Sequence, residues 1–218
     1  MNERVVAEAE PGEVAELLAA LRAIAPPGVD VGAMPISAEH EATLHPGELE
    51  LVASAVPRRR REFATGRALL RAMLGTAAPV LVLTSRAPAL PVGVVASLAH
   101  DGDMAVVVIG AGSAISALGV DLEPIGAVGE AEARVVVRAD EAGLDPTLAF
   151  VAKEAAYKAW SNSGGGLLDH HDVRITCAAG VLPAAFSAEI VAGGATVHGM
   201  LTRTSTRWLA VAAVDAPR

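Results

Sequence analysis

The feature that most constrains this chain is a helix-then-strand order that occurs twice along its 218 residues. Helical periodicity with Pro or Gly boundaries predicts helices over residues 13–24, 48–55, 57–74, 128–138 and 146–160. Short apolar runs between turns predict strands over residues 28–36, 80–83, 104–109, 114–120, 173–176, 185–191, 196–202 and 208–214, the third and fourth as a hairpin. This order predicts an α+β fold of two pseudo-symmetric halves, residues 1–117 and 118–218, each a small, mostly antiparallel sheet packed with helices.

The composition indicates a packed protein and limits its partners. Hydrophobic residues make up 52% of the chain and aromatic residues 3%, so the core must be built from Ala, Val and Leu. A net charge of −8 is unsuited to sequence-independent nucleic-acid binding, and the single Cys177 excludes an intramolecular disulfide. No apolar run approaches the ~20 residues that cross a bilayer, and the acidic N-terminus is not a signal peptide. We therefore expect a cytoplasmic protein with no nucleic-acid or membrane partner.

Two carboxylates stand at the end of a predicted strand, in the segment Gly119–Pro124. Side chains at positions i and i+2 of a strand point to one face, so Asp121 and Glu123 are expected to project together. Adjacent carboxylates repel each other unless a proton or a cation lies between them, and oxygen ligands favour Mg²⁺. The motif alone fits a solvated strand end better than a metal site.

A second acidic position lies on the predicted helix 146–160, where Glu154 and Lys158 share a face at spacing i, i+4. Taken alone, such a pair is most simply an exposed ion pair, which contributes only ~0.3–0.5 kcal/mol. The Glu154–Lys158 pair points to a function only when its position relative to the other motifs is considered.

Basic residues gather at the start of the predicted helix 57–74, where residues 58–61 are all arginine. On a helix, Arg60, Arg67 and Arg71 form one stripe, and guanidinium groups suit phosphates. His100 precedes a turn and is able to hydrogen-bond a phosphate or a ribose. The alternatives are a solvated face or a nucleic-acid patch for the arginines, and a structural role for the histidine.

In order and separation, these motifs resemble the phosphopantetheinyl transferases of the surfactin/enterobactin-synthetase type. The family's G-V-D-[IL]-E segment matches Gly119–Glu123, and its W-x-x-K-E-A-x-x-K segment matches Phe150–Lys158, with Phe in place of Trp. An RR-x-EF-x-x-GR helix and a P-x-x-P-x-G-x-x-x-S-x-x-H stretch, typical of the enterobactin-type branch, match Arg59–Arg67 and Pro88–His100. The matched region runs from about residue 58 to residue 160.

The resemblance implies a catalytic centre in the second half, residues 118–218. Asp121, Glu123 and Glu154 would bind Mg²⁺, with Mn²⁺ as an alternative. Glu154 would also be the general base, and Lys158 would contact the pyrophosphate of coenzyme A.

The resemblance also implies a coenzyme A site whose 3′-phosphate and adenine end binds the first half, residues 1–117. The residues that it assigns to this site are Arg59, Arg60, Arg67, Arg86, Ser97, His100, Lys153 and Lys158. Many relatives carry Ser or Thr immediately before the histidine, whereas this chain has Ala99, which removes one hydroxyl contact.

The implied enzyme is a monomeric, cytoplasmic transferase of the holo-[acyl-carrier-protein] synthase type. It would move the 4′-phosphopantetheine group of coenzyme A to a serine of an apo acyl or peptidyl carrier protein and release adenosine 3′,5′-bisphosphate. The branch points to secondary metabolism, including siderophores. The alternatives are a Mg²⁺-dependent nucleotide or pyrophosphate hydrolase and a non-catalytic relative that binds coenzyme A or a carrier.

Overall fold

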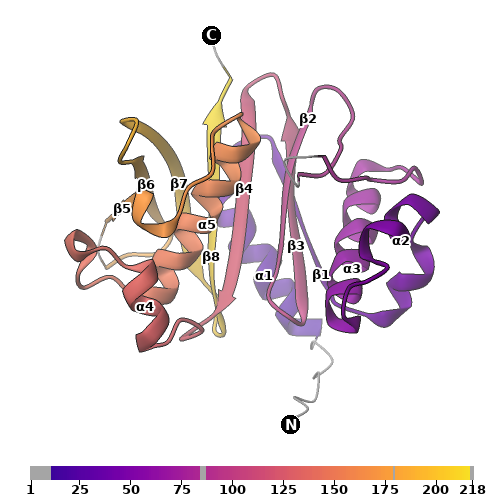
Figure 1. Cartoon of the computed structure of the whole chain (residues 1–218), viewed down its shortest axis with the longest axis horizontal. Coiled ribbons are helices and arrows are strands. Elements are labelled where there is room, and N and C mark those ends of the chain that lie inside the picture. Colours follow the sequence, from indigo (N-terminus) through magenta and orange to yellow (C-terminus); the bar gives the residue numbers. More distant parts are fainter. Residues whose placement is uncertain (1–10, 84–86, 179, 217–218) are drawn as a thin grey trace.

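The computed structural model describes residues 11–83, 87–178 and 180–216. Its first part contains a small sheet with helices packed on both of its faces (Figure 1). The elements are α1 Pro11–Ile24, β1 Val29–Pro35, the 3₁₀ helix η1 Ala38–Thr43, α2 Pro46–Val52, α3 Pro57–Leu74, β2 Val94–His100 and β3 Met104–Ala111. These strands form an antiparallel three-stranded sheet in the order β1-β3-β2.

The second part is built around a five-stranded antiparallel sheet in the order β4-β8-β7-β6-β5. Its elements are β4 Ile115–Pro124, α4 Glu130–Val136, the 3₁₀ helix η2 Ala139–Glu141, α5 Pro146–Asn162, the 3₁₀ helix η3 His170–Asp172, β5 Val173–Cys177, β6 Ala184–Ile190, β7 Ala195–Arg203 and β8 Arg207–Asp215. The predicted α+β fold with two antiparallel sheets packed with helices is confirmed, although the sheets differ in size. The division at residues 117 and 118 falls inside β4 and stays a prediction.

Local sequence signals account for the two helices that matter most for the site. Proline opens α3 and α5, where the missing N–H costs no hydrogen bond. Gly75 ends α3 with a left-handed φ of 62°, and the Asp145 side chain caps α5 by accepting a hydrogen bond from the Leu148 N–H at 2.9 Å. None of the helices in the described residues is long and apolar enough to cross a membrane.

Two strand predictions were wrong. Residues 80–83 do not form a sheet strand, and only Val82 makes an isolated bridge, to Pro88. The predicted hairpin does not form either, because β1 and β2 already occupy both edges of β3. The chain instead crosses to the other sheet, where β4 pairs with β8.

A single core on one face of both sheets joins the two parts. Leu17, Leu21 and Ile24 of α1 pack with Val106 of β3 and with Leu118 of β4, all buried. Leu118, Val120 and Leu122 of β4 therefore face the α1 side, and Gly119, Asp121 and Glu123 face the opposite side of the sheet. At the junction, β2 lies beside β4, and the Ser97 hydroxyl accepts a hydrogen bond from the Val120 N–H at 3.1 Å.

Helix α5 packs closely on the opposite face of the larger sheet (Figure 1). A Cβ built on Gly119 would lie 1.9 Å from the Ala155 carbonyl oxygen and 2.7 Å from the Ala159 nitrogen. The helix face that meets the sheet consists of small, fully buried residues, Ala152, Ala155, Ala156 and Ala159. Because only glycine permits this approach, the residue at position 119 sets the distance between β4 and α5.

We predict that Gly119→Ala lowers the free energy of unfolding by about 1–3 kcal/mol or more, because the added methyl group must push α5 away. Urea denaturation measures this loss. The matched control is Gly12→Ala in the first turn of α1, where an added Cβ meets no atom within 4 Å. Equal stabilities of the two variants would contradict the close approach of α5.

Candidate functional site

A cavity of about 620 Å³ lies where the two sheets meet. It is lined from one side by α2, α3 and β2 and from the other by β4 and α5. Its charged and titratable lining residues are Arg59, Glu62, Arg67, His100, Asp121, Glu154, Tyr157 and Lys158. A neighbouring cavity of about 390 Å³ shares Arg59, Glu62 and His100 and adds Arg58, Asp101 and Glu123.

The acidic wall of the larger cavity comes from the contact between β4 and α5. Asp121 follows Gly119 on the strand face that meets the helix, and its side chain is nearly buried. Its Oδ1 accepts a hydrogen bond from Lys158 Nζ at 2.7 Å, and the same ammonium donates to the Val120 carbonyl at 3.0 Å. Asp121 Oδ2 is buried and has no hydrogen-bond partner. The carboxylate thus has one oxygen open to a further ligand.

The acidic side chains resist ionising together. Burial, opposed by Lys158 and reinforced by Glu154, raises the pKa of Asp121 to about 6. Burial and the charges of Asp121 and Asp101 raise the pKa of Glu123 to about 7, and burial raises the pKa of Glu154. A divalent cation would remove this repulsion.

The fit of these residues to a magnesium ion rests on their chemistry. The three carboxylates supply only oxygen ligands, and the unpartnered Asp121 Oδ2 is the kind of atom that a cation satisfies. No group of three or more acidic, His or Cys side chains converges as a ready metal cage in the described residues. Asp121 and Glu154 line one cavity and Glu123 the next, so a shared ion would draw Glu123 inward.

The basic wall of the cavity comes from α3 and the end of β2. Arg59 Nη1 lies 2.6 Å from His100 Nε2, and Glu62 Oε2 lies 3.5 Å from both Arg59 Nη1 and His100 Nδ1. Burial, together with the charge of Arg59 and against that of Glu62, lowers the pKa of His100 to about 4. His100 is therefore neutral at pH 7 and accepts or donates a hydrogen bond without a charge.

Arg67 lies deeper in the same wall and is almost completely buried. Its guanidinium carbon lies 4.3 Å from the centroid of the Phe63 ring, and its Nε has no hydrogen-bond partner. Burial lowers its pKa to about 10, and the charges of Arg59 and Arg71 add to this while that of Glu48 opposes it. A buried guanidinium with a free donor is suited to bind an anion.

Several predicted site residues lie elsewhere or have other partners. Arg60 does not line either cavity, and its Nε donates to Glu41 Oε2 at 3.3 Å. Ser97 lines the larger cavity, but its hydroxyl is engaged with the backbone of β4. Arg86 lies outside the described residues.

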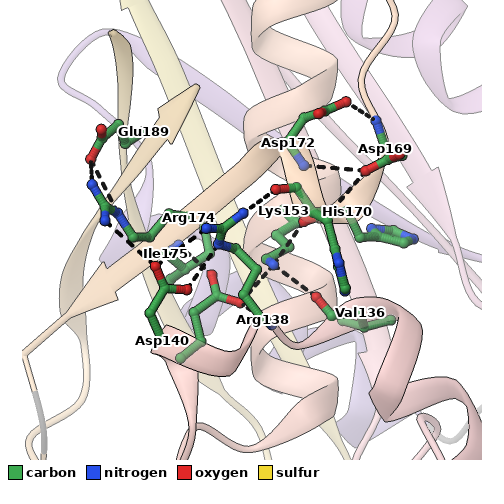
Figure 2. A network of polar contacts seen from close by, with 12 residues as sticks. Val136, Arg138, Asp140, Lys153, Asp169, His170, Asp172, Arg174, Ile175 and Glu189 are labelled. Atoms are coloured by element: carbon green, nitrogen blue, oxygen red, sulfur yellow. Dashed lines mark hydrogen bonds and ion pairs between the residues drawn. The ribbon is translucent and has the colours of Figure 1, made fainter. Parts of the chain in front are cut away.

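Lys153 is not brought into the cavity. Its ammonium group is buried on the far side of α5, where it donates hydrogen bonds to Glu141 Oε2 at 2.7 Å, to the Val136 carbonyl at 2.7 Å and to the His170 carbonyl at 2.8 Å (Figure 2). Glu141 also accepts a hydrogen bond from the Ile175 N–H. Lys153 thereby ties α5 to α4 and to the start of β5 rather than to a ligand.

The cavity residues that the sequence did not predict as site residues include Glu62, Tyr157 and Asn162. Glu62 stands inside the arginine motif and Tyr157 inside the Glu154 motif, so motif membership was the available signal. Asn162 carried no signal, because its role depends on Nδ2 donating to the Leu118 carbonyl at 3.0 Å across the helix–strand contact.

The raised pKa of Asp121 predicts a pH dependence of stability in magnesium-free buffer. A carboxyl with a raised folded-state pKa contributes stability below its unfolded-state pKa of about 3.9, and this stability is lost as pH rises through about 6. We therefore expect Asp121→Asn to melt above the wild type at pH 8, on the order of 2–4 °C, and the gap to narrow towards pH 5. Calorimetry across this range checks the prediction, and a gap that widens towards pH 5 would contradict it.

The buried position of Lys153 predicts a structural rather than a ligand-binding phenotype. Lys153→Met leaves Glu141 unpaired in the interior and should cost about 3–5 kcal/mol of unfolding free energy. The double variant Lys153→Met/Glu141→Gln should recover most of this loss in urea denaturation. A Lys153→Met protein of wild-type stability that no longer bound coenzyme A would overturn this assignment.

Sequence comparisons with known proteins show which family the chain resembles. A sequence-family model of the 4′-phosphopantetheinyl transferase N-terminal domain matches residues 47–110, which include α3 and the His100 strand. The 4′-phosphopantetheinyl transferase Svp of Streptomyces mobaraensis is 33% identical over 186 residues, covering 77% of this chain and 74% of Svp. The 4′-phosphopantetheinyl transferase PptT of Mycobacterium tuberculosis is 32% identical over 180 residues, covering 75% of this chain and 79% of PptT. These identities, each over more than two thirds of the relative's length, show that the chain belongs to the 4′-phosphopantetheinyl transferase family.

Proposed function

We propose that this protein transfers the 4′-phosphopantetheine group of coenzyme A to a serine hydroxyl of an apo carrier protein and releases adenosine 3′,5′-bisphosphate. The observation that supports the proposal most is that basic and acidic side chains line opposite walls of one cavity. Arg59, Arg67 and His100 line one wall, and Asp121 and Glu154 line the other. A substrate with several phosphates needs the first wall, and an activated hydroxyl beside a cation needs the second.

Coenzyme A binding is assigned to the basic wall. The guanidinium groups of Arg59 and Arg67 would hold the 3′-phosphate. Neutral His100 would assist by orienting Arg59, since its Nε2 accepts the hydrogen bond that Arg59 Nη1 donates. Arg60 does not line the cavity, because it forms an ion pair with Glu41. It would contact the ligand only if that ion pair broke. Ser97 would act by holding β2 against β4.

Asp121, Glu123 and Glu154 would hold a Mg²⁺ ion, or Mn²⁺ in its place. When bound, the ion neutralises charge on the pyrophosphate oxygens as the bond to the leaving group breaks. The residues of the chain prepare this site by keeping Asp121 Oδ2 unpartnered and by holding Asp121 and Glu154 on facing elements.

The transfer itself uses Glu154 and Lys158. Glu154 accepts the proton of the carrier serine, directly or through a bound water, because it faces the cavity beside Asp121. The serine oxygen forms a bond to the phosphorus that carries the pantetheine arm. The bridging P–O bond breaks, and its electron pair leaves with adenosine 3′,5′-bisphosphate. Lys158, already within 2.7 Å of Asp121, stabilises the charge that develops on the phosphates.

The finer assignments rest on sequence motifs. The matches at residues 59–67 and 88–100 favour the enterobactin-type branch, and with it carriers of secondary metabolism, including siderophore synthesis. A single cysteine suits a reducing compartment such as the cytoplasm. Two halves within one chain, with the cavity between them, favour a monomeric enzyme.

A carrier-loading assay tests this function. The protein is mixed with coenzyme A, Mg²⁺ and one of several apo carriers at a time, and mass spectrometry measures the mass of each carrier. We expect a gain of one phosphopantetheine on at least one carrier and none on the same carrier with its serine replaced by alanine. Cleavage of coenzyme A without a gain in the mass of any carrier would favour the hydrolase alternative and contradict the proposal.

Variants of the acidic wall test the roles of individual residues. Asp121→Ala and Glu154→Ala should each lower kcat for loading by at least about 100-fold, because each removes a proposed metal ligand and Glu154 is also the base. Glu189→Gln is the matched control, since it removes an exposed carboxylate of β6. Near-normal loading by both Asp121→Ala and Glu154→Ala would remove the proposed metal site.

A further inference from the structure

Arg207, the first residue of β8, is the centre of a buried ion cluster. Its side chain is only 6% exposed, and each of its three nitrogens donates a hydrogen bond to a different carboxylate. Nε contacts Asp101, Nη2 contacts Asp103 and Nη1 contacts Glu13. A planar guanidinium is the side chain best suited to gather several carboxylates at once.

The cluster joins the two parts of the molecule. Arg207 belongs to the five-stranded sheet, whereas Glu13 comes from α1 and both aspartates come from the turn between β2 and β3. The turn that precedes Arg207 makes further links of the same kind.

Those further links come from the serine and threonine of the turn. Glu16 of α1 accepts hydrogen bonds from the Ser205 N–H at 2.7 Å and from its hydroxyl at 2.8 Å. The Thr206 carbonyl accepts a hydrogen bond from the Ile125 N–H at 2.9 Å, which ties the turn to the end of β4. Arg207 and the short turn before it thus together contact α1, the β2–β3 turn and the residue after β4.

The cluster stands directly beside the proposed site. Asp101 follows His100, and in the sheet Arg207 pairs with Pro124 while its neighbour Trp208 pairs with Glu123. His100, Asp101 and Glu123 line the same 390 Å³ cavity. Asp101 therefore connects Arg207 to His100, and Trp208 connects it to Glu123.

Asp101 depends on Arg207 for its charge balance. Its side chain is 1% exposed, and in the described part of the chain Arg207 is the only cationic side chain within 4.0 Å of it. A buried carboxylate without a cation is costly, so the aspartate must stay against the guanidinium. This constraint fixes the backbone that follows His100.

We propose that Arg207 is a positioning residue that clamps the β2–β3 turn to β8 and so holds His100 and Glu123 at the separation that the reaction needs. The inference rests on the proposed function for the roles of His100 and Glu123. It adds a residue that touches neither coenzyme A nor the reacting atoms. The clamp acts through Asp101 on one side and through the β4–β8 pairing on the other.

The test compares Arg207→Met, the milder Arg207→Lys, and the double variant Arg207→Met/Asp101→Asn. Calorimetric titration with coenzyme A, without a carrier, gives Kd; loading assays give kcat and KM; urea denaturation gives stability. The control is Arg174→Met, which removes the same charge from a partly exposed pair with Glu189. Arg174→Met and Arg207→Met therefore have the same net charge.

We expect Arg207→Met to raise Kd for coenzyme A and to lower kcat, each by about 10- to 100-fold, since small misplacements of reacting groups have effects of this size. Arg207→Lys should lie between Arg207→Met and the wild type. The double variant should regain stability, because no carboxylate is left stranded at position 101, while its affinity stays low. Arg174→Met should match the wild type in Kd and kcat.

Two results would overturn the clamp. One is a wild-type Kd and kcat in Arg207→Met; the other is full recovery of affinity together with stability in the double variant, which would leave only a charge-balancing role. A wild-type protein that binds no coenzyme A and loads no carrier would instead count against the proposed function, while the stability data still report on the ion cluster.

Discussion

The close approach of helix α5 to Gly119 of β4 is the contact on which the proposed site depends. A side chain at this position would overlap the Ala155 carbonyl, and the facing helix surface carries only alanines. With the helix seated this closely, the next residue on the same strand face, Asp121, reaches Lys158, and Glu154 opens into the same cavity. A backbone distance set by one glycine thus determines which side chains meet.

The ionisable groups on the two sides of the cavity lie in surroundings that disfavour their charged forms. Asp121 and Glu154 on one wall, and Glu123 in the adjoining cavity, carry carboxyl groups with raised pKa values. The other wall holds a histidine with a lowered pKa and a buried arginine that lacks a partner for its Nε. Such groups are costly without a partner, and a cation and a phosphate, respectively, would satisfy them. Arg71 and Glu48, by contrast, pair with each other in the interior at 2.8 Å.

Sequence reasoning predicted the elements whose signals are local. The helices that open with Pro57 and Pro146 and the end of α3 at Gly75 were predicted within about two residues. The hairpin prediction failed because nothing in the residues of β3 and β4 records that β1 and β2 already occupy both edges of β3. Pairing partners far away in the chain decide such cases.

The same distinction holds within the site. Spacing on a helix placed Glu154 and Lys158 on one face, and both line the cavity. It did not separate Lys153 from them, because the partner that holds Lys153, Glu141, is known only from the fold. Arg207 carried no signal at all, since Asp101 and Glu13 lie 106 and 194 positions away in the sequence.

A crystal structure of the protein with coenzyme A and Mn²⁺, in which anomalous scattering locates the metal, tests the proposed site most directly. We predict Mn²⁺ bound by Asp121, Glu123 and Glu154, with the 3′-phosphate against Arg59, Arg67 and His100. An ion bound away from these carboxylates, or a coenzyme whose 3′-phosphate lies outside the basic wall, would contradict this prediction.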